Sequence, residues 1–288
     1  MRPLFDRLPA GRAQTYHLVL ASAAIPHQLR PHGRYWAIDV PEADRGRAVR
    51  SIALYLAENQ PDGAAQPYPV GQRTYSAVFV IAALAAVHWA IKPGLERRFF
   101  FNTYGADTER ILDGQFYRCI TALLMHADSG HLLSNAAGLA VFGTAVASMC
   151  GWGVGWFMIL AAGALGNLGA ALWYGAGHLA VGASTALFGA VALSAMMTFR
   201  SQLRQGTMRS WRAWAPLAGG LALLGFLGTG PSTDLLAHLA GFISGLAIGG
   251  VYVAAVKDRL SQPIQVAAAL TGLSTAAAAW IAGLYSSG

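Results

Sequence analysis

Four polar residues could do chemistry together, and each lies in or beside an apolar stretch of the sequence. Ser184 and His238 are a nucleophile and a base by residue type, the pair that covalent catalysis by a serine requires. His131 and Asn135 are four residues apart, so on a helix their side chains leave from one face. An imidazole and a carboxamide placed there could donate hydrogen bonds to a developing oxyanion.

Small residues around Ser184 and His238 predict that their two helices approach closely. Glycine recurs every fourth residue after His238, at Gly241, Gly245 and Gly249. A matching stripe around Ser184 consists of Gly182, Ala186, Ala190 and Ser194, with Gly189 beside it. Such stripes let membrane helices pack closely, as a Ser184–His238 hydrogen bond of about 2.6–3.2 Å requires. Phe188 follows Ser184 by four residues, so its ring lies one turn below the hydroxyl.

The elements that must position these residues are membrane helices. Of the 288 residues 55% are apolar and only 11% are charged, whereas soluble domains carry about 25% charged residues. A membrane-spanning helix takes about 20 apolar residues. Seven runs approach or reach that length: 74–91, 131–150, 153–174, 181–199, 213–229, 233–256 and 264–285. The sequence therefore predicts an all-α polytopic membrane protein.

The formal charge of +7 marks membrane orientation rather than a nucleic-acid partner. Of the twenty Lys and Arg residues, nine lie in 1–73, four in 200–212 and two in 257–259, beside apolar runs. Basic flanks favour the cytoplasm, and the loop 200–212 can also contact anionic lipid. The five basic residues of 92–130 oppose this orientation but are outnumbered. We expect the N-terminus inside and the C-terminus outside, which puts Ser184 and His238 about one turn below the outer face.

The N-terminal part predicts a small cytosolic α+β domain over residues 1–58. A helix-like segment is followed by two strands that turn at His32 and Gly33, and Trp36, Ile38 and Val40 share one face of the second strand. Pro41 opens a predicted helix that runs to residue 58, with Ala48, Ile52 and Leu56 on one side. Residues 59–73 are a Pro- and Gly-rich linker, 74–256 a six-span core, and 257–288 a seventh span. The start of the chain has no apolar core of signal-peptide length, so we expect no cleavage.

Four motifs, taken in order, resemble those of the rhomboid family of intramembrane serine proteases. They are GADTERILDGQFYRCIT in the segment between the first two spans, HADSGHLLSN before the second, GAS in the fourth and AHLAGFISG in the sixth. The resemblance covers about residues 74–256. A small cytosolic domain before the core and a seventh span after it also occur in this family.

The resemblance implies a serine endopeptidase with a Ser-His dyad and no acidic third member. Ser184 would be the nucleophile and His238 the base, and the Ser184 N–H, His131 and Asn135 would hold the oxyanion. Phe188 would pack against His238, and His126 would support the loop and hydration of the site. Substrates would be transmembrane helices cut near their outer end, without metal or cofactor. The excess of Arg over Lys, eighteen to two, and the abundance of Ala and Gly favour a bacterium, so we expect a bacterial inner membrane. Nothing in the sequence specifies an oligomeric state.

Other polar residues have simpler interpretations. Asp234 precedes His238 by four residues and could complete a triad, but an acidic residue in the first turn of a helix is better explained by the helix dipole. His88 has no polar neighbour but Trp89 and is interpreted as a packed or interfacial side chain. His178 is interpreted as a solvated loop residue, with a position at the entrance of the site as the alternative, and Asn167 as a hydrogen-bonding link between helices.

Thr185 departs from the family pattern, which has glycine after the serine. Its branched side chain adds bulk beside the oxyanion site, and its hydroxyl could bond back to the preceding turn.

Two competing functions stay open. One is a catalytically silent rhomboid-like protein that binds or escorts membrane proteins. The other is a small transporter, against which stand the lack of an internal repeat and the position of the polar residues near one surface.

Overall fold

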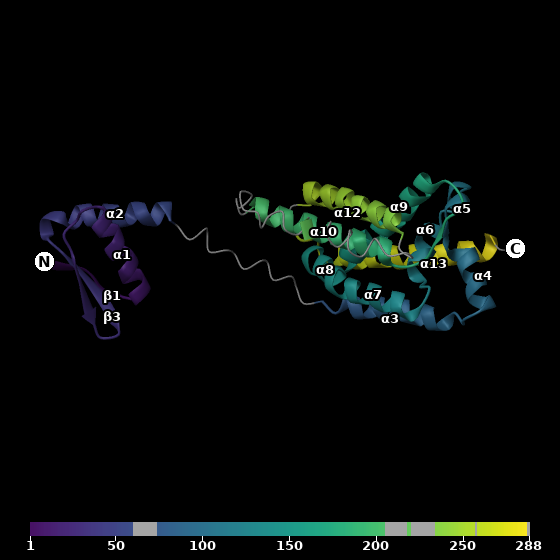
Figure 1. Cartoon of the computed structure of the whole chain (residues 1–288), viewed down its shortest axis with the longest axis horizontal. Coiled ribbons are helices and arrows are strands. Elements are labelled where there is room, and N and C mark those ends of the chain that lie inside the picture. The colour runs from purple at the N-terminus through teal and green to yellow at the C-terminus, as the bar shows by residue number, and fades with distance from the viewer. Residues whose placement is uncertain (60–73, 205–217, 220–233, 257, 287–288) are drawn as a thin grey trace. The chain divides into compact units, whose positions relative to one another are not determined.

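The chain forms two compact units, Met1–Pro67 and Tyr68–Gly288 (Figure 1). This computed structural model describes residues 1–59, 74–204, 218–219, 234–256 and 258–286. Each unit has its own hydrophobic core.

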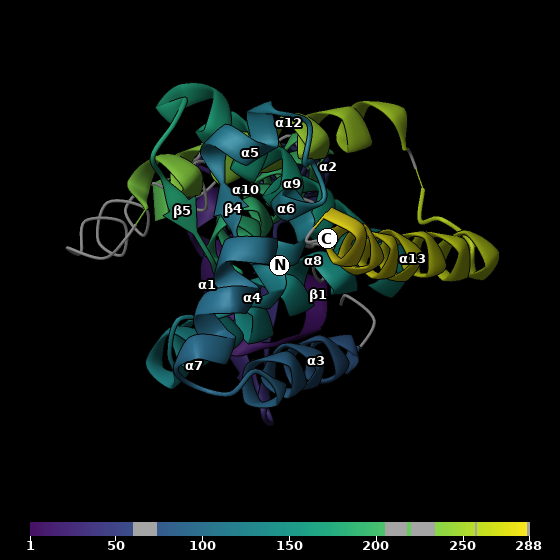
Figure 2. The same cartoon turned by 90° about the vertical axis from the view of Figure 1, so that its right-hand side faces the viewer.

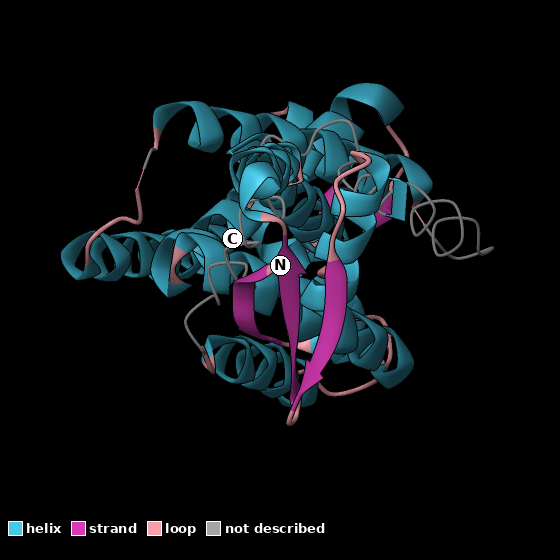
Figure 3. Cartoon of the chain, turned by 90° about the vertical axis from the view of Figure 1, so that its left-hand side faces the viewer, coloured by secondary structure: helices cyan, strands magenta, loops and turns pink. Residues whose placement is uncertain are grey.

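The N-terminal unit is an antiparallel sheet with two helices packed against it (Figure 3). Its elements are β1 (Arg2–Leu8), α1 (Ala10–Ser22), β2 (Gln28–His32), β3 (Tyr35–Val40), η1 (Glu42–Asp44) and α2 (Arg45–Glu58). The strand order is β1-β3-β2. The predicted strand pair is confirmed, and Ile38 and Val40 of β3 are buried as expected.

Three details of this unit differ from expectation. The first residues form β1, which periodicity did not indicate because Pro3 and two shifts of register interrupt the alternation. Pro41 opens a 3-10 turn, and α2 itself begins at Arg45. Leu56 is 42% exposed and lies outside the core that Ala48 and Ile52 enter.

The second unit is helical (Figure 2). Its central helix, α9 (Trp152–Tyr174), contacts helices that come before it and after it in the sequence. Before α9 come α3 (Ser76–Ala90), α4 (Leu95–Tyr104), β4 (Ala106–Asp107), α5 (Thr108–Leu112), α6 (Arg118–Thr121), η3 (Ala122–Leu124), α7 (Ser129–Gly138), the π-helical η4 (Leu139–Gly143) and α8 (Thr144–Cys150). After it come β5 (Leu179–Ala180), α10 (Ser184–Arg204), α12 (Leu235–Ala255) and α13 (Gln262–Ser286).

Four helical stretches are long and apolar enough to cross a membrane: Ser129–Cys150, Trp152–Tyr174, Leu235–Ala255 and Gln262–Ser286. The first predicted span corresponds to the shorter apolar helix α3. The predicted span 213–229 lies, but for residues 218 and 219, outside the described residues. The last run, 264–285, belongs to α13, a continuous helix of 25 residues.

The contact between α10 and α12 is as close as predicted but uses a different face of α10. A Cβ added to Gly241 or Gly245 would collide with main-chain atoms of Thr185 or Gly189, so only hydrogen fits there. The expected stripe through Ala186 is wrong, because Ala186 faces Gly163 of α9 instead. The face of α10 that contacts α12 contains Thr185 and Gly189, each one residue before a member of the expected stripe. This face differs from the expected one because α10 packs on α9 and α12 at once.

Helix α13 is joined to the rest of the unit at both of its ends. Near its start, the buried Gln265 bonds to the turn between α8 and α9. Near its end, the Trp280 ring lies 4.3 Å from that of Tyr104, and Gly283 lies directly against Tyr104. The seventh predicted span is thus packed onto the helices before it.

The two cysteines of the chain, Cys119 and Cys150, are both free and buried. Burial raises the pKa of the Cys119 thiol to about 12. The thiol therefore stays protonated and unreactive at neutral pH.

Candidate active site

Ser184 is the first residue of α10 and follows an extended connection from α9. In that connection β5 pairs antiparallel with β4, and the Gly182 N–H donates to the Ala122 carbonyl at 2.9 Å. The expectation that Ser184 lies one turn inside its helix is therefore wrong. Residues 181–183 are not helical because Gly182 has a φ of +135°. Ser184 thus sits at the open N-terminal end of a helix, where N–H groups lack partners within the helix.

Position 182 requires glycine for two reasons, its backbone conformation and the close approach of His131. A φ of +135° is a conformation that residues with a side chain rarely adopt. A Cβ at this position would also lie 2.5 Å from Cε1 and 2.7 Å from Nε2 of His131. The absence of a side chain brings the His131 ring directly against the segment that leads into Ser184.

His131 and Asn135 lie on the first turns of α7, whose start is held by Asp128. The Asp128 carboxylate caps the helix and accepts the backbone N–H of His131 at 2.8 Å. Asn135 is 3% exposed, and its Nδ2 has no hydrogen-bond partner in the described part of the chain. A buried donor without a partner is costly to the fold, so it suggests that the group serves a ligand.

His238 lies in the first turns of α12 and is 5% exposed. Its ring stacks on Phe188 of α10 with centroids 4.7 Å apart and planes at 30°. The predicted packing of Phe188 against this histidine is confirmed. The Nδ1 atom of His238 is buried and has no partner among the described residues.

One cavity of about 730 Å³ brings the predicted residues together. Its walls include Ser184, His238, His131, Asn135, Phe188 and Gly182. Within the described residues, no hydrogen bond joins Ser184 to His238. Catalytic hydrogen bonds are often long in an unliganded enzyme and shorten when substrate binds. The lack of a hydrogen bond between Ser184 and His238 therefore does not argue against the pair. The described residues contain no cluster of three or more His, Cys, Asp or Glu that could hold a metal ion.

A Rhomboid domain model matches residues 113–255, which carry this cavity. The chain belongs to the rhomboid family. It is 29% identical over 179 residues to the Bacillus subtilis protein named "Putative rhomboid protease YdcA", covering 61% of this chain and 88% of that protein.

Two further matches in this family cover only a small part of the relative. The Emericella nidulans "Rhomboid-type serine protease 2" is 30% identical over 47% of this chain and 26% of its own length. The human "Inactive rhomboid protein 1" is 31% identical over 48% of this chain and 16% of its own length. Proteins named as proteases and proteins named as inactive thus both resemble this rhomboid.

His126 lies behind the cavity wall of this rhomboid rather than in it. Its Nε2 accepts the Ala183 N–H at 3.4 Å, and its ring meets the His131 ring edge-on at 5.2 Å. Burial lowers the pKa of His126 to about 4, so the ring is neutral at pH 7 and can accept this bond. The residue supports the backbone next to Ser184, in line with the role that the family resemblance implies.

No hydrogen bond joins the Asp234 carboxylate to the His238 side chain within the described residues. It caps α12 by accepting the Ala237 N–H at 2.9 Å, and it also accepts the Tyr174 hydroxyl at 3.0 Å. Its second oxygen lies 2.6 Å from Nε2 of His178. Asp234 is thus the N-cap of α12 and not, as expected, a residue of its first turn, and its carboxylate is already occupied by partners other than His238.

Two histidines have partners that the sequence did not indicate. His178 was expected in solvent but lines the cavity and pairs with Asp234. His88 was expected to have no polar neighbour, yet its Nε2 lies 3.3 Å from the Ser129 hydroxyl. Both partners are helix-capping or first-turn residues far away in sequence, which periodicity does not pair. Asn167 donates to the Cys119 carbonyl at 2.9 Å, so its predicted role as a link between segments is confirmed.

Thr185 fits this rhomboid because two glycines make room for it. Its methyl group would lie 2.5 Å from a Cβ on Gly166 of α9 and 3.0 Å from one on Gly241 of α12. The expected hydroxyl bond to the preceding turn is not formed among the described residues. The methyl group of Thr185 therefore fills the junction of three helices.

Proposed function

We propose that this rhomboid is an intramembrane serine endopeptidase that cuts transmembrane-helix substrates near the outer membrane face. The supporting observation is the single cavity that Ser184, His238, His131 and Asn135 line together. In this proposal the core has six spans, α13 is a seventh, and the N-terminal unit lies in the cytoplasm. The basic residues beside the spans support this orientation.

In the proposed reaction, the Ser184 hydroxyl attacks the scissile carbonyl while His238 takes its proton. Because Nδ1 of His238 is buried, we assign proton transfer to Nε2. His238 then gives this proton to the leaving amine, and a water that it activates hydrolyses the acyl-enzyme. The stack on Phe188 limits rotation of the imidazole between these steps.

The oxyanion would be stabilised by His131, Asn135 and the Ser184 N–H. Each such donor is worth about 3–4 kcal/mol of barrier in other serine proteases. The unpaired Nδ2 of Asn135 and the contact of His131 with Gly182 support this assignment. An N–H at the start of α10 has no acceptor within the helix and is free to serve the oxyanion.

The test uses the full chain reconstituted in vesicles with a tagged single-span substrate. Removing a serine nucleophile costs on the order of 10⁶-fold in kcat, so Ser184→Ala should cleave nothing measurable and should not react with a fluorophosphonate. Ser194→Ala is the matched control, because Ser194 lies on the same helix and, among the described residues, donates its hydroxyl to the carbonyls of Ala190 at 2.8 Å and Phe142 at 3.5 Å. Cleavage that persists in Ser184→Ala contradicts the assignment.

The second candidate is a catalytically silent protein that binds membrane helices. It is favoured by the similarity to proteins named as inactive rhomboids. The same experiment separates the two functions. A silent protein captures the tagged substrate without cutting it, and it does not react with the fluorophosphonate probe.

A further inference from the structure

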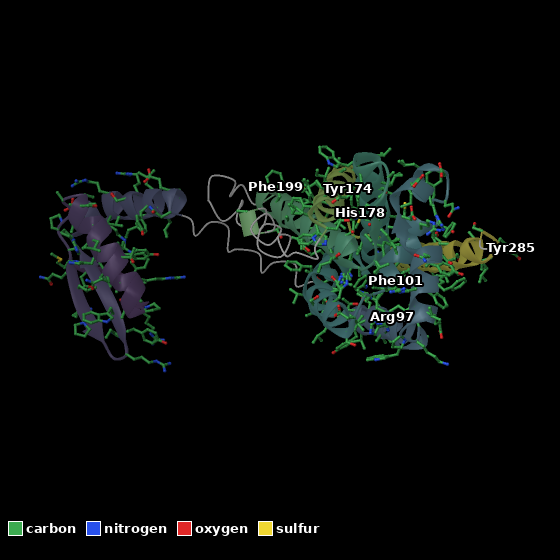
Figure 4. The ribbon with its side chains drawn as sticks, turned by 45° about the vertical axis from the view of Figure 1, so that its right-hand side comes forward. Arg97, Phe101, Tyr174, His178, Phe199 and Tyr285 are labelled. Atoms are coloured by element: carbon green, nitrogen blue, oxygen red, sulfur yellow. The ribbon has the colours of Figure 1, made fainter. Side chains whose placement is uncertain are left out.

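Three side chains from separate segments meet at the edge of the cavity, apart from the proposed catalytic residues. Tyr174 is the last residue of α9, His178 lies in the connection to α10, and Asp234 precedes α12. All three line the cavity, and Figure 4 shows Tyr174 and His178 next to each other. The side chains of His178 and Asp234 are 30% and 14% exposed, which places the cluster at the solvent edge.

The three groups satisfy one another. The Asp234 carboxylate accepts the Tyr174 hydroxyl at 3.0 Å on one oxygen and contacts His178 Nε2 at 2.6 Å on the other. The rings of Tyr174 and His178 stack with centroids 4.1 Å apart and planes at 18°. Hydrogen bonds to a carboxylate are short and about twice as strong as those between neutral groups. The cluster is therefore a firm connection between three segments.

This connection holds the turn of α12 that carries His238. The His238 N–H donates to the Asp234 carbonyl at 3.0 Å, so the histidine lies in the turn that Asp234 begins. Below His238, the helix is fixed by the contact of Gly241 with Thr185. Above it, the cluster provides the side-chain hydrogen bonds that join this end of α12 to other segments among the described residues. The first turn of a helix frays when its cap and outside contacts are lost.

The same connection reaches the segment that leads into Ser184. The His178 carbonyl accepts the Thr108 N–H at 3.0 Å, and the next two residues pair with β4. Six residues after His178 the chain reaches Ser184. The cluster thus joins the segment before the proposed nucleophile to the helix of the proposed base.

We propose that Tyr174, His178 and Asp234 form an outer latch that positions His238 for proton transfer from Ser184. The inference rests on the proposed protease function for its kinetic consequence, but the latch itself concerns the order of α12. None of the three side chains touches the reacting atoms, so they are positioning residues.

The test compares His178→Ala with His178→Gln in the full chain in vesicles. The alanine removes the donor to Asp234, whereas the glutamine amide can donate to the same carboxylate without a ring. The alanine should lower kcat and the rate of fluorophosphonate labelling on the order of tenfold, as expected for the loss of one charge-assisted hydrogen bond, with KM unchanged. Glutamine should restore most of both rates. Amide hydrogen exchange in residues 235–241 should be faster in the alanine variant and near wild type in the glutamine variant.

Two further variants complete the test. His17→Ala removes an imidazole whose Nδ1 lies 2.7 Å from His27 in the N-terminal unit, and it should change neither rates nor exchange in α12. Tyr174→Phe deletes one hydroxyl and should change kcat, labelling and hydrogen exchange in the same direction as His178→Ala, but less. It takes the place of His178→Ala in the test if His178→Ala does not fold.

The outcomes distinguish the latch from the protease function. Wild-type kcat, labelling and exchange in His178→Ala overturn the latch and leave the protease function in place. Equal losses in the alanine and glutamine variants also overturn it, because the donated hydrogen bond is then not what matters. If the wild type neither cleaves nor reacts with the probe, the protease function fails, and the exchange data alone decide the latch.

Discussion

Two buried polar sites in the second unit differ in how completely their groups are paired. At the start of α13, Gln265 is 2% exposed, and both polar atoms of its side chain are hydrogen-bonded. Its Oε1 accepts the N–H groups of Gly153 and Val154 at 3.0 and 2.9 Å, and its Nε2 donates to the Cys150 carbonyl at 3.1 Å. At the cavity, by contrast, Asn135 Nδ2 and His238 Nδ1 are buried without partners among the described residues.

This difference is the one expected between a polar residue that stabilises the fold and residues proposed to bind a ligand. Gln265 supplies an acceptor for N–H groups at the start of α9 and a donor for the end of α8, groups that a helix cannot satisfy itself. It therefore lowers the energy of the fold. The unpaired groups of the cavity raise that energy, and such a cost is common at sites that bind a ligand or a transition state.

Among the variants that test this difference in pairing, Asn135→Ala is expected to have the largest effect. We expect kcat to fall about 10²–10³-fold, because one oxyanion donor is lost, and the melting temperature to stay or rise, because an unpaired donor is removed. Asn167→Ala provides the contrast, since Asn167 is equally buried but hydrogen-bonded, and it should lower the melting temperature. Cleavage assays and thermal unfolding in vesicles measure both. A stable, fully active Asn135→Ala would contradict the oxyanion role.

A medium effect is expected at the paired site. Gln265→Leu leaves two N–H groups and a carbonyl without partners, at a cost of about 1–3 kcal/mol for each group that finds no other partner. We expect a clear drop in melting temperature, while the folded fraction keeps its kcat. Gln262→Leu is the matched control, because Gln262 lies on the same helix and makes one long contact of 3.4 Å with Trp152. If both variants unfold alike, the bonds of Gln265 do not stabilise the protein.

The smallest effect is expected at Thr185, which belongs to neither class. Thr185→Gly removes a buried methyl group between Gly166 and Gly241, so a loss of about 1 kcal/mol of stability is expected. Turnover should be equal or higher, because the side chain is not needed for the proposed chemistry. Side-by-side cleavage assays at equal folded concentration measure this. A complete loss of cleavage would mean that the hydroxyl takes part in the reaction.

Residue spacing, together with the predicted topology, indicated that Ser184, His238, His131 and Asn135 share one site, and all four line the cavity. The i,i+4 pairs of His131 with Asn135 and of Ser184 with Phe188, and the glycines after His238, depend only on helical periodicity. The family resemblance added the supporting role of His126. The apolar run 181–199 placed Ser184 about one turn inside its helix, because hydropathy could not show that Gly182 holds an extended segment in front of α10.

Contacts between distant segments were not predictable in this way. The pairing of His178 with Asp234, the bonds of Gln265 and the exact face of α10 against α12 depend on how several helices pack at once. Capping residues choose their partners from whatever the fold brings near, and a glycine stripe does not state which neighbour it faces. Such features follow from tertiary structure rather than from local pattern.

The burial of Cys119 and Cys150 makes the protein well suited to thiol-specific labelling. Both native thiols are shielded from a water-soluble maleimide, so a single cysteine introduced on the surface carries the whole signal. Placed within residues 200–212 or in the connection after α9, such a residue reports on which side of the membrane that part of the chain lies. Placed at the start of α12, a spin label or fluorophore follows the motion of that helix end in real time.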